Sequence, residues 1–233
     1  MKTIISIILS ASFFTAQAQF HSGDVKPMIT KTLGASFQKF DGLNGRVAGS
    51  PQFKQLPDYA ATIGLGWMKE RKRVISSGGV TLGSSMSGDK DEKSSTIRFI
   101  GVNADLGYDL IPSERVMLYP LVGLGFQHYQ AIFYKDNSNV PFDDVLNSAS
   151  VKNDIQSVRF NNSFFVYRAG LGFNLKSPKN PAHSIGLQAG YTGSFNDNSW
   201  RSNENQALAN SPADKVGQFF VSLVLTSAPC MFK

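Results

Sequence analysis

Cysteine is almost absent from this chain. Among its 233 residues Cys230, near the end, is the only one. A single cysteine cannot form a disulfide within the chain, so backbone pairing and packing have to supply the stability. Histidine is also scarce, and His21, His128 and His183 are far apart in the sequence. Since neither a metal-ligand cluster nor a Ser/His/Asp arrangement is visible, we expect no metal and no cofactor.

Long apolar stretches are absent after the N-terminus. No later window of ~20 residues is free of charged side chains, so no transmembrane helix is expected there. The first residues differ: Lys2 precedes an apolar run that reaches Phe14, and Ala16-Gln17-Ala18 follows. This order predicts a secretory signal peptide over residues 1–18, because the apolar run is short for a membrane anchor. We expect residues 19–29 to form a polar lead.

A concentrated charge of one sign is also missing, although the formal net charge is +6. The basic residues are dispersed, and the one cluster, at 69–73, has no interleaved aromatic residues. Nucleic-acid-binding surfaces combine basic clusters with aromatic side chains that stack on bases. We therefore expect no nucleic-acid partner, and we interpret residues 69–73 as a solvated turn near a membrane surface.

Helical periodicity of useful length is not visible, whereas a period of two is clear in residues 97–134. In the first half, aliphatic residues such as Val102 and Leu106 alternate with polar or small ones such as Asn103 and Asp105. After residues 112–115 the alternation restarts and continues to residue 134. A period of two predicts strands, and two long strands joined by a tight turn make a hairpin.

The same alternation recurs along the chain and predicts eight strands. They cover residues 30–40, 58–68, 74–86, 97–110, 116–134, 160–175, 184–195 and 215–226. The connections after the second, fourth and sixth strands are expected to be short, and the others long. Up-and-down strands place all short turns at one end, which is typical of outer-membrane barrels. We expect a barrel domain at 30–227 and a C-terminal tail at 228–233.

The position of the glycines indicates which face meets lipid. They share the polar phase of the strands, where a narrow barrel interior needs small residues. These are Gly64, Gly66, Gly101, Gly107, Gly123, Gly125, Gly170, Gly172, Gly186 and Gly190. The predicted fold is all-β: an eight-stranded antiparallel up-and-down transmembrane β-barrel with short periplasmic turns and long extracellular loops. The alternative is a soluble, lipocalin-like carrier with the leucines inside.

Aromatic residues fall into two groups on the outward phase. Trp67, Tyr108 and Phe173 lie near the short turns. Phe126, Tyr191 and Phe195 lie towards the long loops. We interpret them as two interfacial girdles. Ordinary β-propensity of a phenylalanine-rich chain is the alternative explanation.

The inward phase holds few charged residues. Asp105 and Asp109 are on the fourth strand and Arg168 is on the sixth, with Asp105 and Arg168 at similar heights. A buried charge needs a partner, so we predict a contact between Arg168 and Asp105. The supporting polar residues are expected to be Asn103, Gln127 and Gln188. Such a side-chain-filled lumen leaves no wide channel.

Pro120 is an anomaly within the fifth predicted strand. Proline lacks the N–H that a central strand donates, and a closed barrel has no edge that would tolerate the loss. We expect a bulge or a shifted strand start at this position.

A signal peptide, eight glycine-rich amphipathic strands and sorted loops together resemble the small outer-membrane β-barrel family. This family includes the OmpA membrane domain, OmpX and OmpW, and belongs among the porin-like barrels. The resemblance implies residence in the outer membrane of a Gram-negative bacterium. It also implies contact with outer-membrane lipids and lipopolysaccharide, and insertion by the barrel-assembly machinery. The implied role is non-enzymatic, in surface binding or envelope integrity.

A lipid-modifying enzyme is the second possibility. Outer-membrane lipid A deacylases resemble this architecture and use a lipid-facing histidine with a serine two residues later. His128 has the outward phase, but residue 130 is a glutamine. Asp89, Asp91 and Glu92 lack the spacing and glycine of a calcium loop, so we interpret them as a solvated loop.

Overall fold

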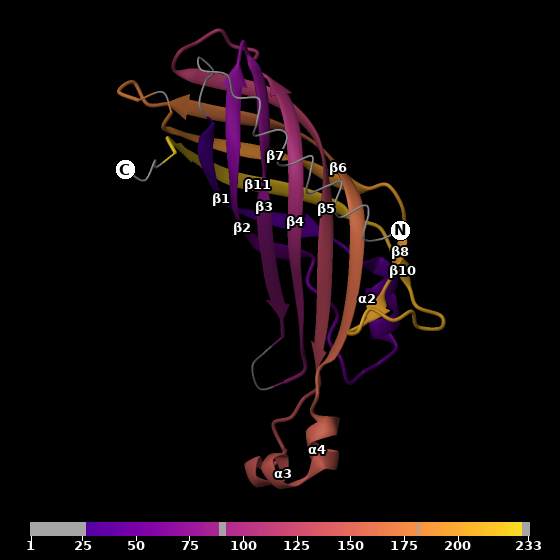
Figure 1. Ribbon diagram of the computed structural model, residues 1–233. Coiled ribbons are helices and arrows are strands. Elements are labelled where there is room, and N and C mark those ends of the chain that lie inside the picture. The colour runs from indigo at the N-terminus through magenta and orange to yellow at the C-terminus, as the bar shows by residue number, and fades with distance from the viewer. Residues whose placement is uncertain (1–26, 89–91, 181, 230–233) are drawn as a thin grey trace.

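Eight long strands form a closed antiparallel barrel in the computed structural model, which describes residues 27–88, 92–180 and 182–229 (Figure 1). They are β1 (Met28–Gln38), β2 (Tyr59–Arg71), β3 (Val74–Ser87), β4 (Ser94–Tyr108), β5 (Val116–Tyr134), β6 (Val158–Lys176), β7 (Ser184–Ser194) and β11 (Gly217–Ser227). Each strand pairs with the next in the chain, and β11 pairs with β1 to close the barrel. The predicted up-and-down topology is confirmed.

The alternation of side chains along each strand separates an outer from an inner face. On β4 and β5, Leu106, Val122 and Leu124 are each at least 60% exposed, whereas Asp105 and Leu121 are buried. The predicted orientation of residues 97–134 is therefore confirmed. The predicted bounds of β5 agree with the structure, and the other strands differ by up to three residues at their ends.

The connections define two ends of the barrel. The short-turn end has the connections 72–73, 109–115 and 177–183, and the long-loop end has 39–58, 88–93, 135–157 and 195–216. One prediction is wrong here: the β3–β4 connection, 88–93, is no longer than a short turn. The reason is that β3 and β4 continue to pair as far as Ser87 and Ser95, so residues expected in the loop belong to the sheet.

The described parts of the long loops contain three helices, where no helix was predicted. They are α2 (Asp41–Ala48), α3 (Phe142–Asn147) and α4 (Ala149–Asp154). In α2, Leu43 and Val47 lie one turn apart and both are buried, so packing against the barrel outweighs the low helix propensity of Gly42 and Gly45. Figure 1 shows α3 and α4 at the far tip of the β5–β6 hairpin. No helix within the described ranges has the length and hydropathy to cross a membrane.

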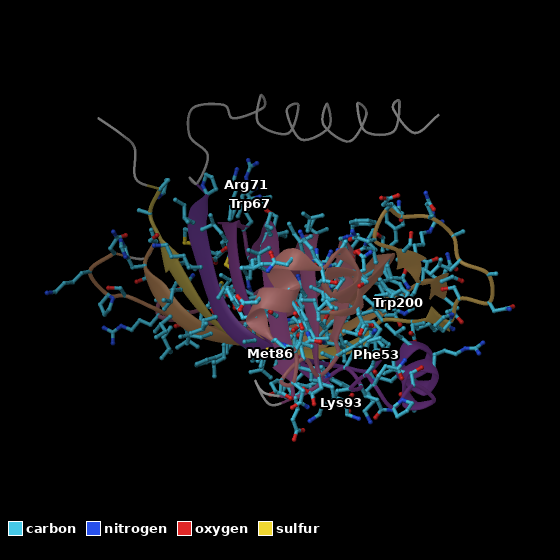
Figure 2. All side chains as sticks on the ribbon, turned by 90° about the horizontal axis from the view of Figure 1, so that it is seen from below. Phe53, Trp67, Arg71, Met86, Lys93 and Trp200 are labelled. Atoms are coloured by element: carbon cyan, nitrogen blue, oxygen red, sulfur yellow. The ribbon has the colours of Figure 1, made fainter. Side chains whose placement is uncertain are left out.

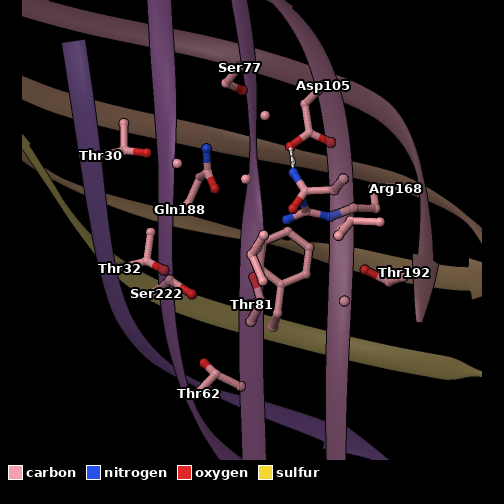
Figure 3. A pocket seen from close by; sticks show the side chains of 18 of the residues that line it. Thr30, Thr32, Thr62, Ser77, Thr81, Asp105, Arg168, Gln188, Thr192 and Ser222 are labelled. Atoms are coloured by element: carbon pink, nitrogen blue, oxygen red, sulfur yellow. Dashed lines mark hydrogen bonds and ion pairs between the residues drawn. The ribbon is translucent and has the colours of Figure 1, made fainter. Parts of the chain in front are cut away.

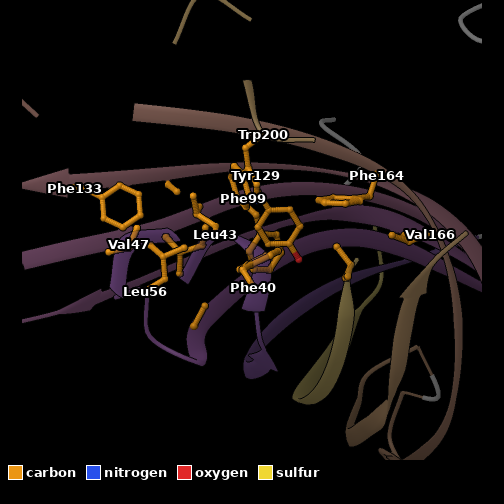
Figure 4. Packing of buried hydrophobic residues seen from close by; sticks show 14 residues of the cluster. Phe40, Leu43, Val47, Leu56, Phe99, Tyr129, Phe133, Phe164, Val166 and Trp200 are labelled. Carbon is orange, nitrogen blue, oxygen red and sulfur yellow. The ribbon is translucent and has the colours of Figure 1, made fainter. Parts of the chain in front are cut away.

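Apolar layers fill the lumen at both ends. At the short-turn end, the inward side chains of β2, β3 and β5 form a cluster of Met68, Ile75, Met117, Tyr119 and Leu121. At the long-loop end, α2 and the loop after β7 contribute to a larger cluster (Figure 4). The sequence predicted an inward face of glycines, amides and acids, which is correct only for the middle of the barrel.

The bulge predicted at Pro120 is absent. Pro120 pairs with Leu171 of β6, and the register is constant along both edges of β5. Leu118 directs its N–H and C=O towards the β4 side. Residues two apart in a strand direct these groups the same way, so the missing N–H of Pro120 also faces β4. The paired ladder with β4 ends at Leu121, next to that position, so no bulge is required.

Several predicted features lie outside the described residues. They are the signal peptide at 1–18, most of the lead at 19–29, Asp89 and Asp91, and the end of the tail with Cys230.

Candidate functional site

The middle of the lumen contains the ion pair that the sequence predicts. Arg168 Nη1 on β6 lies 2.8 Å from Asp105 Oδ2 on β4. Asn103 Nδ2 donates to the same carboxylate oxygen at 2.6 Å. The Arg168 guanidinium also lies over the Phe220 ring, with its central carbon 4.8 Å from the ring centroid. The side chains of Asp105 and Arg168 are 4% and 15% exposed, so each charged group needs the other as its counterion.

The intervening strand β5 gives this pair its space. Gly123 is the register partner of both Asp105 and Arg168. A Cβ at Gly123 would meet Asp105 Oδ1 and, at 2.5 Å, the carbonyl oxygen of Ala104. The glycine is therefore required by the close approach of the carboxylate.

A polar cavity of about 100 Å³ lies beside the ion pair (Figure 3). Its lining includes the hydroxyls of Thr30, Thr32, Thr62, Ser77, Thr81 and Ser222. A cavity of this size and polarity accommodates a few water molecules. Its lining also includes Met68 of the short-turn cluster, and Phe99 and Val166 of the long-loop cluster.

Two other predicted residues lie in the lumen but do not contact the ion pair. Gln188 Nε2 donates to Tyr119 Oη at 3.2 Å, near the short-turn end. Gln127 Nε2 donates to Gln218 Oε1 at 3.1 Å, and Gln127 Oε1 accepts from Tyr129 Oη at 2.9 Å. The contacts of Gln127 with Gln218 and Tyr129 form a second network nearer the long-loop end. Tyr119, Gln218 and Tyr129 were not predicted as members. Tyr119 and Gln218 have partners on other strands, whereas Tyr129 contacts Gln127 on its own strand.

Asp109 does not belong to the lumen network, so its predicted place is wrong. It lies in the connection after β4, where its Oδ1 accepts from the N–H groups of Ile111 and Leu118 at 3.2 and 3.1 Å. β4 ends at Tyr108, so Asp109 is no longer part of the strand. Its carboxylate instead accepts hydrogen bonds that close the β4–β5 turn.

A folded cap covers the long-loop end, and one carboxylate holds it together. Asp214 in β10 (Ala213–Asp214) accepts from the N–H groups of Gly42 and Leu43 at 2.7 and 3.0 Å, at the start of α2. The same carboxylate accepts from Trp200 Nε1 at 2.7 Å. β10 pairs with β8 (Asn198–Ser199), and β9 (Arg201–Ser202) pairs with the edge of β6. Asp214 thus connects the loop after β1 to the loop after β7.

Aromatic packing attaches this cap to the barrel. Phe40 lies between Tyr129 and Trp200, with ring centroids 5.1 and 5.3 Å apart, in edge-to-face geometry (Figure 4). Tyr129 also packs against Phe99 and Phe164. Sequence reasoning missed Trp200 and Asp214. The only available signal was a tryptophan in a polar loop, which is costly unless it is buried.

The outer face carries the aromatic residues that the sequence assigned to two girdles. Trp67, Tyr108 and Phe173 are more than 40% exposed on the outer face towards the short-turn end. Towards the long-loop end, Phe126 packs on Phe165 at 5.4 Å. Further round the barrel, Tyr167, Tyr191, Phe195 and Phe219 make contacts at 5.1–6.3 Å. The second group thus consists of one aromatic pair on β5 and β6 and a separate chain of four rings that runs from β6 to β11.

His128 lies on the outer face of β5 and contacts Ser163 on β6, its register partner. The distance from Nδ1 to Ser163 Oγ is 2.8 Å. Within the described part of the chain, no carboxylate contacts the histidine ring. The described residues also contain no group of three or more His, Cys, Asp or Glu that could hold a metal ion.

One loop acid is perturbed at the tip of the long-loop end. The side chain and the backbone N–H of Ser138 donate to Asp136 at 2.6 and 2.9 Å and lower the pKa of this carboxyl. Asp136 therefore stays ionised over a wider pH range, which adds to the acidity of the 135–157 loop.

A closed barrel with an apolar outer face and a filled lumen defines an integral β-barrel membrane protein. The chain belongs to the outer membrane protein beta-barrel domain family, whose model matches residues 6–225. It is therefore a protein of the outer membrane of a Gram-negative bacterium.

Solved outer-membrane proteins are similar to this chain. Ail, the attachment invasion locus protein of Yersinia pestis, is 17% identical, with a TM-score of 0.47 over 86% of this chain and 97% of Ail. The Neisserial surface protein A is 9% identical, with a TM-score of 0.45 over 88% and 98%. A major outer membrane protein from Thermus thermophilus is 10% identical, with a TM-score of 0.49 over 87% and 100%. A comparison with curated proteins found no match.

Proposed function

We propose that this protein is a non-enzymatic barrel that displays its cap outside the cell, where it binds a surface partner or supports envelope integrity. The observation that carries this proposal is the contact of Asp214 with α2 and Trp200. This contact makes two long loops into one packed unit instead of independent mobile segments. The ion pair and the apolar layers support a lumen that serves as a core and not as a passage.

The outer band and its aromatic margins support contact with outer-membrane lipids and lipopolysaccharide. Residence in the outer membrane also supports insertion by the barrel-assembly machinery. We propose that the short turns face the periplasm and the long loops face the exterior, as in other barrels of this kind.

Labelling of intact cells tests this orientation. Leu146 in α3 is 67% exposed at the tip of the long-loop end, and Lys179 is exposed at the short-turn end. In a Cys230→Ser background, we expect a membrane-impermeant maleimide to label Leu146→Cys on intact cells. Lys179→Cys is the matched control and should react only after the outer membrane is permeabilised. The reverse result would contradict the proposed display of the cap.

The non-enzymatic assignment has a separate test. His128 and Ser163 have the side chains of a base and a nucleophile. The structure supports a cross-strand hydrogen bond between them, and among the described residues no third group orients the ring. We expect lipid A and phospholipids from cells that overexpress the protein to match those from cells without it, and His128→Ala to change nothing. A cleaved lipid that appears with the native protein and disappears with His128→Ala would establish the enzyme instead.

A further inference from the structure

The β2–β3 turn breaks the usual rule for turn residues. Arg71 pairs directly with Val74, so the turn has two central residues, Lys72 and Arg73. Their φ angles are +49° and +70°. Two positive φ values are typical of a type I′ turn, whose preferred sequences are Asn-Gly and Asp-Gly because other side chains are strained there. This sequence has Lys72 and Arg73 at the two positions where Asn-Gly or Asp-Gly would be unstrained.

The barrel holds these cations at its rim. Arg73 Nε donates to the carbonyl oxygen of Asp109 at 2.9 Å, and the guanidinium lies 5.0 Å from the centroid of the Tyr108 ring. Lys72 is exposed beside it. These contacts fix the direction in which the turn presents its charge.

The charge is part of an asymmetry between the two ends of the barrel. In the segments 69–73, 109–115 and 177–183 at the short-turn end, basic residues outnumber acidic ones two to one. In the segments 39–58, 135–157 and 195–216 at the long-loop end, acidic residues outnumber basic ones. The basic excess of the barrel therefore lies at the short-turn end, and the β2–β3 turn is its densest part.

The cationic turn continues directly into the lipid-facing band. Trp67 lies on the outer face of β2, with its ring over Gly78 of β3, and Tyr108 is the register partner of Val74. Figure 2 shows Trp67 and Arg71 together, on the opposite side of the view from Phe53 and Lys93. Cations just beyond an interfacial aromatic belt lie at the depth of lipid headgroups.

We propose that the β2–β3 turn, through Lys72 and Arg73, docks on anionic phospholipid headgroups of the adjacent leaflet. This inference rests on the membrane placement in the proposed function. Charge complementarity favours a phosphate-bearing headgroup with a net negative charge over a zwitterionic one. The strained backbone fits this role, because a relaxed Asn-Gly turn would remove both charges from the headgroup layer.

Trp67 provides a local reporter. It is one of two tryptophans. The other, Trp200, is buried in the cap at the long-loop end, so Trp200→Phe changes the cap and leaves the short-turn end as it is. The Trp200→Phe protein is inserted into phosphatidylcholine vesicles with a minor fraction of phosphatidylglycerol. Bromine in the acyl chains of one lipid or the other quenches nearby indoles, so the two quenching curves give the local lipid composition around Trp67. We expect phosphatidylglycerol to be enriched about fivefold at low salt, and less at high salt.

The decisive variant is Lys72→Asn with Arg73→Gly. It has the sequence that a type I′ turn prefers, so it should fold at least as well as the native barrel. We expect its enrichment of phosphatidylglycerol to fall from about fivefold to below about twofold, because Lys69 and Arg71 remain. The matched control is Arg46→Gln with Lys54→Gln, which removes the same charge from exposed positions at the long-loop end and should leave the enrichment unchanged.

The outcomes separate this inference from the membrane placement. Equal quenching by both lipids would overturn the docking on anionic headgroups and leave the lipid-facing band intact. Undiminished enrichment in the Asn-Gly variant would also overturn it. If neither brominated lipid quenches Trp67, the outer face does not meet lipid, and both the inference and the proposed function fail.

Discussion

Asp105→Asn should destabilise the barrel by about 3–5 kcal/mol, because it leaves Arg168 charged and buried without its counterion. The amide oxygen of the substituted side chain can still accept from Asn103. The substitution therefore removes the negative charge and leaves the shape of the side chain almost unchanged. The measurement is equilibrium unfolding in urea, with the barrel refolded in detergent or lipid. The folded fraction at each urea concentration is the fraction that migrates as the compact form on an unheated gel.

An exposed ion pair gives the control for this prediction. Lys39 and Asp58 lie 3.8 Å apart with side chains more than half exposed, so Asp58→Asn should change the free energy of unfolding by less than about 1 kcal/mol. Combining Asp105→Leu with Arg168→Met should recover most of the loss, because an apolar pair does not need a counterion. If Asp105→Asn costs no more than Asp58→Asn, water in the lumen cavity screens the pair and the lumen is not a dry core.

The faces of the strands were predictable because a period of two depends on each residue alone. Leu106 and Val122 point outwards and Asp105 inwards whatever their neighbours are. The contact between Arg168 and Asp105 followed from the same phase and from strand heights. The prediction of this contact was also favoured because the lumen contains few other charged groups that could pair with a buried arginine. The period-of-two pattern, which is a local property, was therefore sufficient to predict one long-range contact.

The errors arise from features that periodicity does not encode: the partners of a segment and the residues at which strands end. The α2 segment has two glycines and a weak helical pattern, and it is ordered because Asp214, far along the chain, accepts from its first N–H groups. Asp109 left the lumen because β4 ends early and the turn needs its carboxylate. Pro120 needed no bulge because the β4 ladder stops beside it. Periodicity specifies neither the partner that Asp214 provides for α2 nor the residue at which β4 ends.

The joint at Asp214 should determine whether the cap stays closed. Asp214→Ala removes the acceptor for two N–H groups at the start of α2 and for the Trp200 indole, and all three donors lie in a buried or part-buried setting. Loss of such a helix cap and a charged hydrogen bond costs about 2–4 kcal/mol. We expect this cost to fall on the cap alone, because the barrel ladder does not involve Asp214.

Limited proteolysis measures the opening directly. In Asp214→Ala, cleavage within 39–58 and 195–216 should become more than about tenfold faster, since a locally open segment is cut in proportion to its population. The barrel should still migrate as the compact form, and Trp200 emission should shift to the red in a Trp67→Phe background. Asp197→Ala is the matched control: this acid lies in the same loop, more than half exposed, 3.0 Å from Lys215. Equal cleavage of the two variants would show that aromatic packing of Phe40, Tyr129 and Trp200 holds the cap without the carboxylate.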